Sequence, residues 1–323
     1  MSTPSPVPLS RAVAPETFHE PVSGISLAKK NVLITGAASG IGAVIARTFA
    51  EKGIRAYVTL VDKNEELGKE YTSQLQGKGL RVQFVAADVT SWEAQVAAFK
   101  AAVKFHPDSV LDIVVANAGM FSEPFVAPDE SPISLDQDPP RPETTPWEVN
   151  TIGFSFTAKL AQLYFELPSE KPAAKPKCLI LVSCIAAYVD FPVVAAYTSS
   201  KYGARGFFKN MRGIFSSRGH RVNLIAPWIY DTPMAAGVIP LLEAVDAPVS
   251  DIGLMSNAAV KLVEDDTING RAFSVGPERM IDLCDDVEGG NAETGIAELR
   301  KDAPQWEEKV VGMLELMGYS KVF

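Results

Sequence analysis

Short apolar runs alternate with amphipathic stretches along most of the chain. The first runs are NVLIT, AYVTLV, RVQFVAA and LDIVVA, and helical patterns over residues 41–52, 65–76 and 91–105 separate them. The runs CLILVS, RVNLIA and RAFSV follow later. Continuous apolar strands separated by helices are typical of a parallel sheet that is covered on both faces. The pattern therefore predicts an α/β fold, a single doubly wound, Rossmann-type domain with a parallel sheet of about seven strands.

Three segments flank or interrupt this alternation. Residues 1–27 contain five prolines and no periodic apolar pattern, so we expect a flexible N-terminal arm before a dinucleotide-binding and catalytic domain over residues 28–280. Residues 121–146 contain seven prolines and six acidic side chains, which predicts an irregular insertion at the ligand-facing edge of the sheet. Residues 232–262 are placed to form a substrate lid that excludes water.

The remaining residues, 281–323, are predicted to form a C-terminal tail. The tail contains a helical pattern whose apolar face carries Trp306, Val310, Met313 and Met317. A helix with one apolar face needs a surface that covers this face. We expect the helix to dock on the body of the protein, with a partner subunit as the alternative.

Composition and charge narrow the class of protein. Of the 323 residues, 47% are hydrophobic and 21% are charged, and the net charge is −9. This balance is typical of a globular protein, and the negative charge argues against a nucleic-acid partner. Three cysteines and three scattered histidines predict neither a disulfide framework nor a metal site. No apolar run reaches the roughly 20 residues of a membrane span, and the N-terminus lacks a secretory signal, so we expect a cytoplasmic protein.

The segment TGAASGIG follows the first predicted strand and opens the first predicted helix. Glycines at such a turn let the backbone approach a pyrophosphate, whose charge the helix N-terminus favours. A glycine-rich turn also occurs as a plain connection between strand and helix. The residues of this segment expected to bind a dinucleotide are Gly36, Ser39, Gly40, Ile41 and Gly42.

An acidic residue strengthens the dinucleotide interpretation. Asp62 ends the second predicted strand, about 20 residues after the turn. Its carboxylate would accept hydrogen bonds from the adenosine ribose and would repel a 2′-phosphate. We therefore expect NAD as the cofactor, with NADP less favoured. The adjacent Lys63 weakens this preference without reversing it.

The chemistry is predicted to depend on a tyrosine and a lysine. Tyr197 and Lys201 are four residues apart, so a helix places both on one face. A free phenol has a pKa near 10, and a neighbouring ammonium together with an oxidised nicotinamide would lower it toward the working range. Ser183, at the end of a predicted strand, supplies a hydroxyl that can hold the substrate oxygen. Without Ser183 and the glycine turn, the Tyr–Lys pair would be read as an ordinary amphipathic helix.

Together these motifs, in this order, resemble the short-chain dehydrogenase/reductase family from about residue 29 to residue 276. The resemblance implies that Asp88 and Val89 contact the adenine. It also implies that Asn117, Ala118 and Gly119 form a cofactor-binding turn, and that Pro227 and Thr232 belong to the loop over the nicotinamide. Asn150 would order a water that links Lys201 to solvent. Asn150, Ser183, Tyr197 and Lys201 match the family's catalytic residues, and Tyr197 and Lys201 are also expected to bind the cofactor.

The resemblance implies an activity. Tyr197 would take a proton from a secondary alcohol, which is oxidised to a ketone with NAD. The segments IAPWIYDTPM and EDDTINGRAF are similar to fungal secondary-metabolite alcohol dehydrogenases of the 5′-hydroxyaverantin dehydrogenase kind and, more distantly, to 15-hydroxyprostaglandin dehydrogenase. The family pairs its subunits through the helices that contain Asn150 and Tyr197, so a homodimer or homotetramer is expected. The alternatives are an NADPH-dependent ketoreductase on the same scaffold and a non-redox member that only binds the nucleotide.

Two positions depart from the family pattern. Trp228 stands where the family usually has Gly after the proline of the nicotinamide loop, and its indole either packs as core or lines the substrate cavity. Cys184 follows Ser183 and is expected to be buried filler rather than a second nucleophile.

The expected substrate pocket is apolar and aromatic. Such walls favour a lipophilic small-molecule alcohol or ketone, polycyclic or polyketide-like, over a sugar or an acid. The residues predicted to line the pocket are Met120, Ile185, Tyr188, Trp228 and Met234, with Phe121, Tyr230 and Val238 nearby.

Overall fold

The computed structural model describes residues 5–14, 22–23, 27–52, 56–122, 124–125, 134–168, 176–191 and 194–318. At its centre is one sheet of eight strands in the order β3-β2-β1-β4-β5-β6-β7-β8. The strands are β1 (Asn31–Thr35), β2 (Tyr57–Asp62), β3 (Val82–Ala86), β4 (Ile113–Ala116), β5 (Cys178–Val182), β6 (Arg221–Pro227), β7 (Ala272–Val275) and β8 (Met280–Asp282).

The first seven strands are parallel, and this confirms the predicted Rossmann-type α/β fold. β8 was not predicted. It pairs antiparallel with β7, with Phe273 opposite Asp282. A three-residue strand carries too little alternation to be recognised from the sequence. The strand order reverses between β1 and β4, so a ligand site is expected at the carboxyl ends of these strands.

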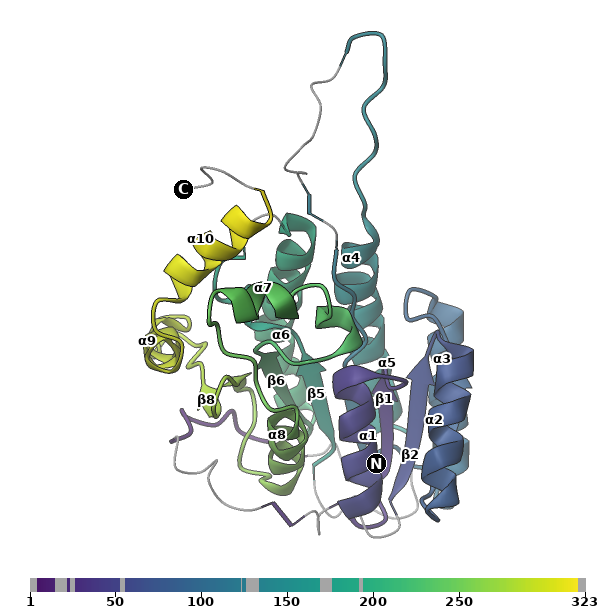
Figure 1. Ribbon diagram of the computed structural model, residues 1–323. Coiled ribbons are helices and arrows are strands. Elements are labelled where there is room, and N and C mark those ends of the chain that lie inside the picture. The colour runs from purple at the N-terminus through teal and green to yellow at the C-terminus, as the bar shows by residue number, and fades with distance from the viewer. Residues whose placement is uncertain are drawn as a thin grey trace.

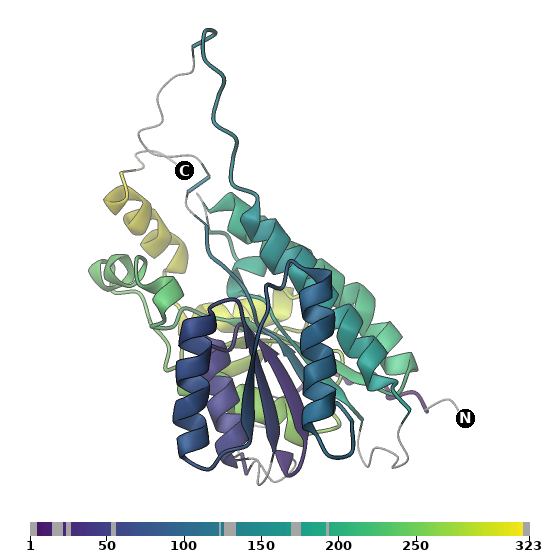
Figure 2. The ribbon, with the colours of Figure 1, turned by 90° about the vertical axis from the view of Figure 1, so that its right-hand side faces the viewer.

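Two helical layers cover the sheet. On one face lie α1 (Gly40–Lys52), α2 (Glu65–Gly77) and α8 (Gly253–Glu264), and on the other lie α3 (Trp92–Phe105), α5 (Phe154–Phe165) and α6 (Ala195–Ser217). Figure 2, which shows the molecule from the side of α2 and α3, has the strands between these two layers. Each layer buries its own apolar core against the sheet, as parallel sheets require.

Local signals explain where several helices begin. Asn64 and Ser91 precede α2 and α3, and their side chains accept hydrogen bonds from the backbone N–H groups of Leu67 and Ala94. These caps satisfy amide groups that a helix N-terminus leaves unpaired. The helices begin within one residue of the positions predicted from the hydrophobic pattern.

Shorter helices surround the carboxyl end of the sheet. α4 (Thr145–Trp147) and the π-helix η3 (Glu148–Gly153) lead into α5, and the 3₁₀ turn η4 (Ile185–Ala187) follows β5. The turn η5 (Pro233–Ala235) and α7 (Ile239–Ala244) lie between β6 and α8, and α9 (Glu293–Asp302) and α10 (Trp306–Leu316) follow β8. Figure 1 shows α7 and α10 at the same end of the body as residues 134–144, which rise above it.

The described part of the N-terminal segment contacts the body. Val7 N–H donates to Ser216 O (3.0 Å), and Val13 N–H donates to the Asp282 carboxylate (2.8 Å). Leu27, the last residue of the predicted arm, is fully buried in the core on the α1 face. The flexibility of the arm stays a prediction, but Leu27 belongs with the domain.

α8 corrects the outer limit of the predicted lid. Its residues Met255, Ala259, Val260 and Leu262 are fully buried, and the helix packs against α1, β5 and β7. A helix buried to this extent is part of the core. A lid at this position is therefore restricted to the residues before Gly253.

No helix within the described part of the chain is long and apolar enough to span a membrane.

Candidate active site

A cavity of about 920 Å³ opens at the carboxyl ends of the parallel strands. Gly36, Asn117 and Ser183 directly follow β1, β4 and β5 and line it, and Asp62 and Pro227 end β2 and β6. Residues from η5, α7 and α10 complete its walls. The cavity therefore lies at the switch in strand order, as predicted for a doubly wound sheet.

The glycine turn forms one end of the cavity. Gly36 and Gly40 have φ angles of +65° and +53°, in the left-handed region that glycine adopts without strain. Gly42 lies behind the turn, where a Cβ atom would be 2.1 Å from Gly36 O. Gly36, Ser39, Gly40 and Ile41 line the cavity, whereas Gly42 does not. Gly42 instead permits the close approach of α1 to the turn.

Asn117 ties the glycine turn to the next strand. Its Nδ2 donates to Thr35 O and Gly36 O, both at 3.0 Å. Thr35 Oγ1 accepts the backbone N–H groups of Asn117 and Ala118, both at 3.1 Å. The turn after β4, which continues with Gly119, is thereby fixed against the turn after β1. Asn117, Ala118 and Gly119 all line the cavity.

Two acidic residues line the cavity near the ends of β2 and β3. Asp62 accepts the backbone N–H groups of Ala38 and Asn64, both at 3.0 Å, so its carboxylate is held against the glycine turn. Asp88 accepts the N–H and the hydroxyl of Thr90, both at 2.8 Å, and these bonds hold the pKa of Asp88 below its usual value. Asp62, Asp88 and Val89 line the cavity, and so does Lys63.

Ser183, Tyr197 and Lys201 meet at the cavity wall. Ser183 follows β5, while Tyr197 and Lys201 lie one turn apart on α6, and all three are buried. Ser183 Oγ donates to Lys201 O (3.2 Å), and Lys201 Nζ lies 5.5 Å from the centre of the Tyr197 ring. The structure thus brings together the three residues that the sequence separates by up to 18 positions.

Burial sets the protonation of this group. It raises the pKa of Tyr197 well above its usual value, an effect to which the neighbouring Cys184 adds, and it lowers the pKa of Lys201. The surrounding residues of the protein therefore raise the pKa of Tyr197, whereas an oxidised nicotinamide beside it is expected to lower this pKa. Cys184 is half-buried and lines the cavity, which corrects its expected role as buried filler.

Asn150 connects the turn after β4 to α6. It lies in the π-helix η3, a distortion that is frequent at functional sites. Its Nδ2 donates to Met120 O and Ser200 Oγ, and its Oδ1 accepts Met120 N–H, all at 2.9 Å. A Cβ atom on Gly119 would lie 3.2 Å from both Asn150 Oδ1 and Lys201 Nζ. Asn150 and Lys201 therefore converge on the turn, although Asn150 itself does not line the cavity.

The loop after β6 reaches back to the glycine turn. Pro227 and Thr232 line the cavity. A Cβ atom on Gly40 would lie 3.5 Å from Thr232 Cγ2. These features form a cradle for a dinucleotide: positive-φ glycines at a helix N-terminus, a carboxylate held at the end of β2, and a loop that closes from the other side.

Comparisons with known proteins agree with this geometry. A family model described as short chain dehydrogenase matches residues 30–240. A 5′-hydroxyaverantin dehydrogenase of Dothistroma septosporum is 39% identical over 287 residues, 85% of this chain and 93% of that protein. A second 5′-hydroxyaverantin dehydrogenase, from Emericella nidulans, is 38% identical over 86% of this chain and 95% of its own length. The chain belongs to the short-chain dehydrogenase/reductase family.

Solved structures show the same fold. A 3-ketoacyl-(acyl-carrier-protein) reductase from Brucella melitensis complexed with NADH superposes with a TM-score of 0.64 at 22% identity, over 78% of this chain and 98% of that chain. A short-chain type dehydrogenase/reductase from Mycobacterium marinum gives a TM-score of 0.65 at 20% identity, over 78% and 96% of the two chains. The match to the family model and the two relatives at 38–39% identity, rather than these structures, make the chain an oxidoreductase of a family that binds nicotinamide cofactors.

Trp228, where short-chain dehydrogenases/reductases usually have Gly, fulfils both roles considered for it. It is buried, its Nε1 donates to Pro248 O (3.0 Å), and its side chain also lines the cavity. Its ring lies 4.7 Å from that of Trp306 in an edge-to-face arrangement. Trp228 therefore joins the loop after β6 to the C-terminal helix.

Two predicted pocket residues lie elsewhere. Ile185 is fully buried and does not line the cavity. Tyr188 does not line it either: its hydroxyl donates to Asp285 (3.0 Å), and Arg205 lies over its ring. Burial alone would raise the pKa of Asp285, but hydrogen bonds from Arg205 and Lys209 hold it below its usual value. Both side chains are structural because η4 turns them away from the site.

The other predicted pocket residues do line the cavity, and α10 adds a set that was not predicted. Met120 and Met234 lie on its walls, as do Phe121, Tyr230 and Val238. The added residues are Val310, Met313 and Leu314 on α10 and Met317, which directly follows it. The apolar face of this helix was the signal for them, but the pattern did not show that the covering surface is the active site.

Proposed function

We propose that this protein is an NAD-dependent oxidoreductase that interconverts a secondary alcohol and a ketone on a lipophilic, polycyclic or polyketide-like small molecule. One observation carries the proposal: Ser183, Tyr197 and Lys201 line the same cavity as the glycine turn and Asp62. A protein that only binds a nucleotide has no need of a buried tyrosine and lysine beside it.

The roles of the chain's residues follow from their positions. Ser183 turns its single O–H from Lys201 O to the substrate oxygen and donates a hydrogen bond there, and Tyr197 exchanges a proton with that oxygen. Lys201 places a positive charge near the phenol, which favours the phenolate and opposes the effect of burial. Asn150 is a positioning residue, because it joins the turn after β4 to α6 through Met120 and Ser200. Asn150 would also order a water that links Lys201 to solvent, as the family resemblance implies.

A bound nicotinamide would accept the hydride from the alcohol carbon, while the hydroxyl proton goes to Tyr197. The residues that would hold the dinucleotide share the cavity or border it: those of the glycine turn, Asp62, Asp88 and Val89, the turn at Asn117, Pro227 with Thr232, and Tyr197 with Lys201. Asp62 supports NAD, because its carboxylate is fixed where a 2′-phosphate would be repelled. Cells usually keep NAD oxidised, and this favours alcohol oxidation.

The cavity supports the substrate class. Its walls around the catalytic residues include Phe121, Phe191, Trp228, Leu241 and Met313. Burial of apolar area provides the main gain in binding for such walls. The names of the two 5′-hydroxyaverantin dehydrogenases are consistent with an alcohol substrate.

A second candidate is an NADPH-dependent ketoreductase on the same scaffold. Lys63 favours it, because this lysine lines the cavity next to Asp62 and could pair with a 2′-phosphate. Two relatives are named NADP-dependent dehydrogenases, at 28% and 31% identity.

The test is turnover of a panel of lipophilic secondary alcohols and ketones with each cofactor, followed by nicotinamide absorbance. We expect alcohol oxidation with NAD and its loss in Tyr197→Phe. A large preference for NADPH would favour the ketoreductase, and full activity of Tyr197→Phe would exclude Tyr197 as the base. Nucleotide binding without redox activity on any panel member would favour the non-redox alternative.

We also propose a homodimer or homotetramer in the cytoplasm. The surface formed by η3, α5 and α6 exposes the apolar side chains of Ile152, Leu163, Tyr202 and Ile214. Exposed apolar groups on neighbouring helices are typical of subunit contacts. Light scattering of the purified protein measures the mass that tests this assembly. Of the predicted lid, residues 232–252 remain our proposal, because Met234 on η5, Val238 directly before α7 and Leu241 on α7 line the cavity.

A further inference from the structure

One apolar part of the cavity is built mainly by α7 and α10, which follow the nucleotide motifs in the sequence. We call it the distal compartment and define it by Trp228, Leu241, Val310, Met313, Leu314 and Met317. We propose that the distal compartment is a subsite for the flat, neutral ring system of a polycyclic secondary alcohol, and that α10 sets the size of substrate that the enzyme accepts. This inference rests on the proposed function for the identity of the reacting group.

The position of α10 is the first support. Val310, Met313, Leu314 and Met317 follow helical spacing on one face, and all four line the cavity. Val310, Met313 and Leu314 are largely buried, whereas Leu316, on another face of the same helix, is 57% exposed. The apolar face of α10 is thus directed toward the site that contains Tyr197 and Lys201.

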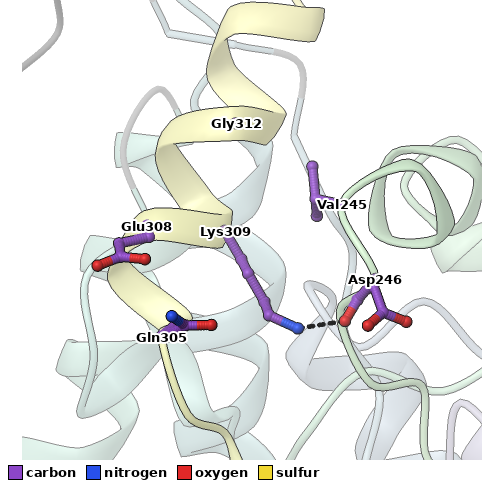
Figure 3. Close-up of a pocket in the computed structure, with 6 residues that line it drawn as sticks. All are labelled: Val245, Asp246, Gln305, Glu308, Lys309 and Gly312. Atoms are coloured by element: carbon purple, nitrogen blue, oxygen red, sulfur yellow. Dashed lines mark hydrogen bonds between the residues drawn. The ribbon is translucent and has the colours of Figure 1, made fainter.

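Contacts at two points hold α10 in this position. Trp306, at its first residue, packs against Trp228 with ring centres 4.7 Å apart and against Phe191 at 5.4 Å. Farther along, Lys309 Nζ donates to the backbone oxygen of Asp246, just after α7 (Figure 3). A Cβ atom on Gly312 would lie 3.1 Å from Val245 Cγ1, so the two helices pack closely. The wall is therefore part of the folded structure.

The chemistry of the lining indicates the ligand. Four of the eight methionines of the chain, Met120, Met234, Met313 and Met317, line the cavity. The thioether of Met is polarisable and flexible, and it makes favourable contacts with aromatic rings. None of the described side chains that α7 and α10 contribute to the lining is charged. These walls suit a neutral aromatic ring system and would disfavour an acid or a sugar.

The size of the cavity is consistent with two occupants. Its volume of about 920 Å³ lies near the upper end of the range of roughly 300–1,000 Å³ for single ligand sites. Because the glycine turn and the catalytic residues line the same cavity, a dinucleotide and a substrate would share it. The distal compartment is the part left for those rings of the substrate that do not react.

The test uses two alcohols with the same benzylic reacting carbon, tetralol with two rings and tetrahydroanthracenol with three. Met313→Ala and Met317→Ala shorten the wall, and Leu314→Trp fills the compartment. Leu316→Ala is the matched control on the exposed face of α10. Turnover is followed at the nicotinamide absorbance, and the Kd of the three-ring ketone is measured by calorimetry in the presence of NAD.

For Met313→Ala and Met317→Ala we expect a loss of about tenfold in kcat/KM for tetrahydroanthracenol, with a similar rise in the Kd of its ketone. The loss for tetralol is expected to be about threefold or less, because its two rings reach less of the wall. Leu314→Trp should increase this discrimination. Leu316→Ala should change neither alcohol by more than about twofold.

The outcomes separate this inference from the proposed function. Equal losses for both alcohols, or the same effect in Met313→Ala and Leu316→Ala, would overturn the subsite while leaving the activity in place. Binding of the ketone that weakens in the α10 variants, without turnover by the unmodified enzyme, would support the subsite and reject the activity. Absence of ketone binding would overturn the subsite. Met317 is only half-buried, so Met317→Ala provides a folded variant if Leu314→Trp is unstable, as thermal unfolding will show.

Discussion

The two ends of the active-site cavity are built by different means. At the nucleotide end, backbone groups and glycines form the surface, and hydrogen bonds from Asn117 and to Asp62 hold them in place. At the distal end, the surface is made of apolar side chains from α7, α10 and Trp228. A pyrophosphate is recognised by backbone N–H groups, whereas an apolar ring is recognised by shape and by buried area. The comparison explains why one end follows the family pattern closely and the other does not.

The two ends also differ in how far apart their parts lie in the sequence. Gly36, Asp62 and Asn117 each follow or end a neighbouring strand, so the sheet alone brings them together. Trp228 and Trp306 are brought together by the packing of the C-terminal tail on the body. Substitutions at the nucleotide end should therefore disturb a closely packed backbone turn, while those at the distal end should change only the fit of a side chain.

The largest effect is expected at the boundary between the two ends. Tyr197→Phe removes the proton-transfer group and should lower kcat for alcohol oxidation about a thousandfold. The affinity for NADH, measured by its fluorescence, should stay within about threefold of the unmodified value. Loss of NADH binding together with activity would mean that Tyr197 serves the nucleotide end instead.

Gly42→Ala tests the close packing of the backbone at the nucleotide end. The added Cβ would lie 2.1 Å from Gly36 O and 2.5 Å from Asn117 Nδ2, so the turn must move. We expect the Kd of NADH to rise about 30-fold, corresponding to roughly 2 kcal/mol of overpacking. Gly77→Ala is the matched control, because its Cβ would meet nothing within 4 Å. An equal response of the two variants would contradict the tight turn.

Asp62→Ser tests the cofactor preference. The substitution replaces a carboxylate with a neutral hydroxyl. It therefore removes the negative charge that the backbone N–H groups of Ala38 and Asn64 hold in place. We expect the ratio of kcat/KM with NADP to that with NAD to rise about 20-fold, the size of one charge-assisted hydrogen bond. Lys63→Ala should lower the same ratio. An unchanged ratio in Asp62→Ser would place the selecting group elsewhere.

The pH dependence of turnover tests the protonation of Tyr197, which lies at the boundary between the two ends. Burial raises the pKa of Tyr197, so the phenol is protonated at neutral pH unless added positive charge lowers the pKa. Alcohol oxidation needs the phenolate, and kcat/KM should rise about tenfold per pH unit until the pKa of the complex is reached. Ketone reduction needs the phenol, so it should be constant at low pH and fall above that pKa. A rate of oxidation that falls as the pH rises would contradict this assignment.

The smallest effect is expected at the outer edge of the distal end. Lys309→Ala removes the bond to Asp246 O, which lies at the surface. We expect a loss of about 0.5 kcal/mol in the free energy of unfolding, or roughly 1 °C in Tm. Lys301→Ala, which removes an exposed pair with Glu298 on α9, is the control. A much larger loss in Lys309→Ala would show that this bond, and not the Trp306 contact, holds α10.

Local signals were sufficient for most of the nucleotide end. The glycine turn, Asp62 and the Tyr197–Lys201 pair were predicted because each needs a particular residue at a particular place relative to a strand or helix, whereas Asn117 was implied by the family resemblance. The hydrophobic alternation gave the parallel sheet for a related reason, since both faces of each central strand are buried. The three-residue β8 escaped notice because it is too short to show a pattern.

Tertiary packing decided the rest. Ile185 and Tyr188 follow Ser183 closely, yet Tyr188 turns to Asp285, which is 97 residues away. Trp228 was left between core and cavity because only its partner Trp306 settles where the indole lies. The apolar face of α10 could be read from its spacing, but not the surface that covers it.

The sequence by itself thus determined the sheet, the nucleotide motifs and the candidate catalytic residues, because these depend on backbone geometry and on residues close together in the chain. Only the tertiary structure decided which apolar side chains line the cavity. Apolar packing is not directional, so many surfaces could cover the same helix face, and the one that does is selected by the fit of the whole molecule.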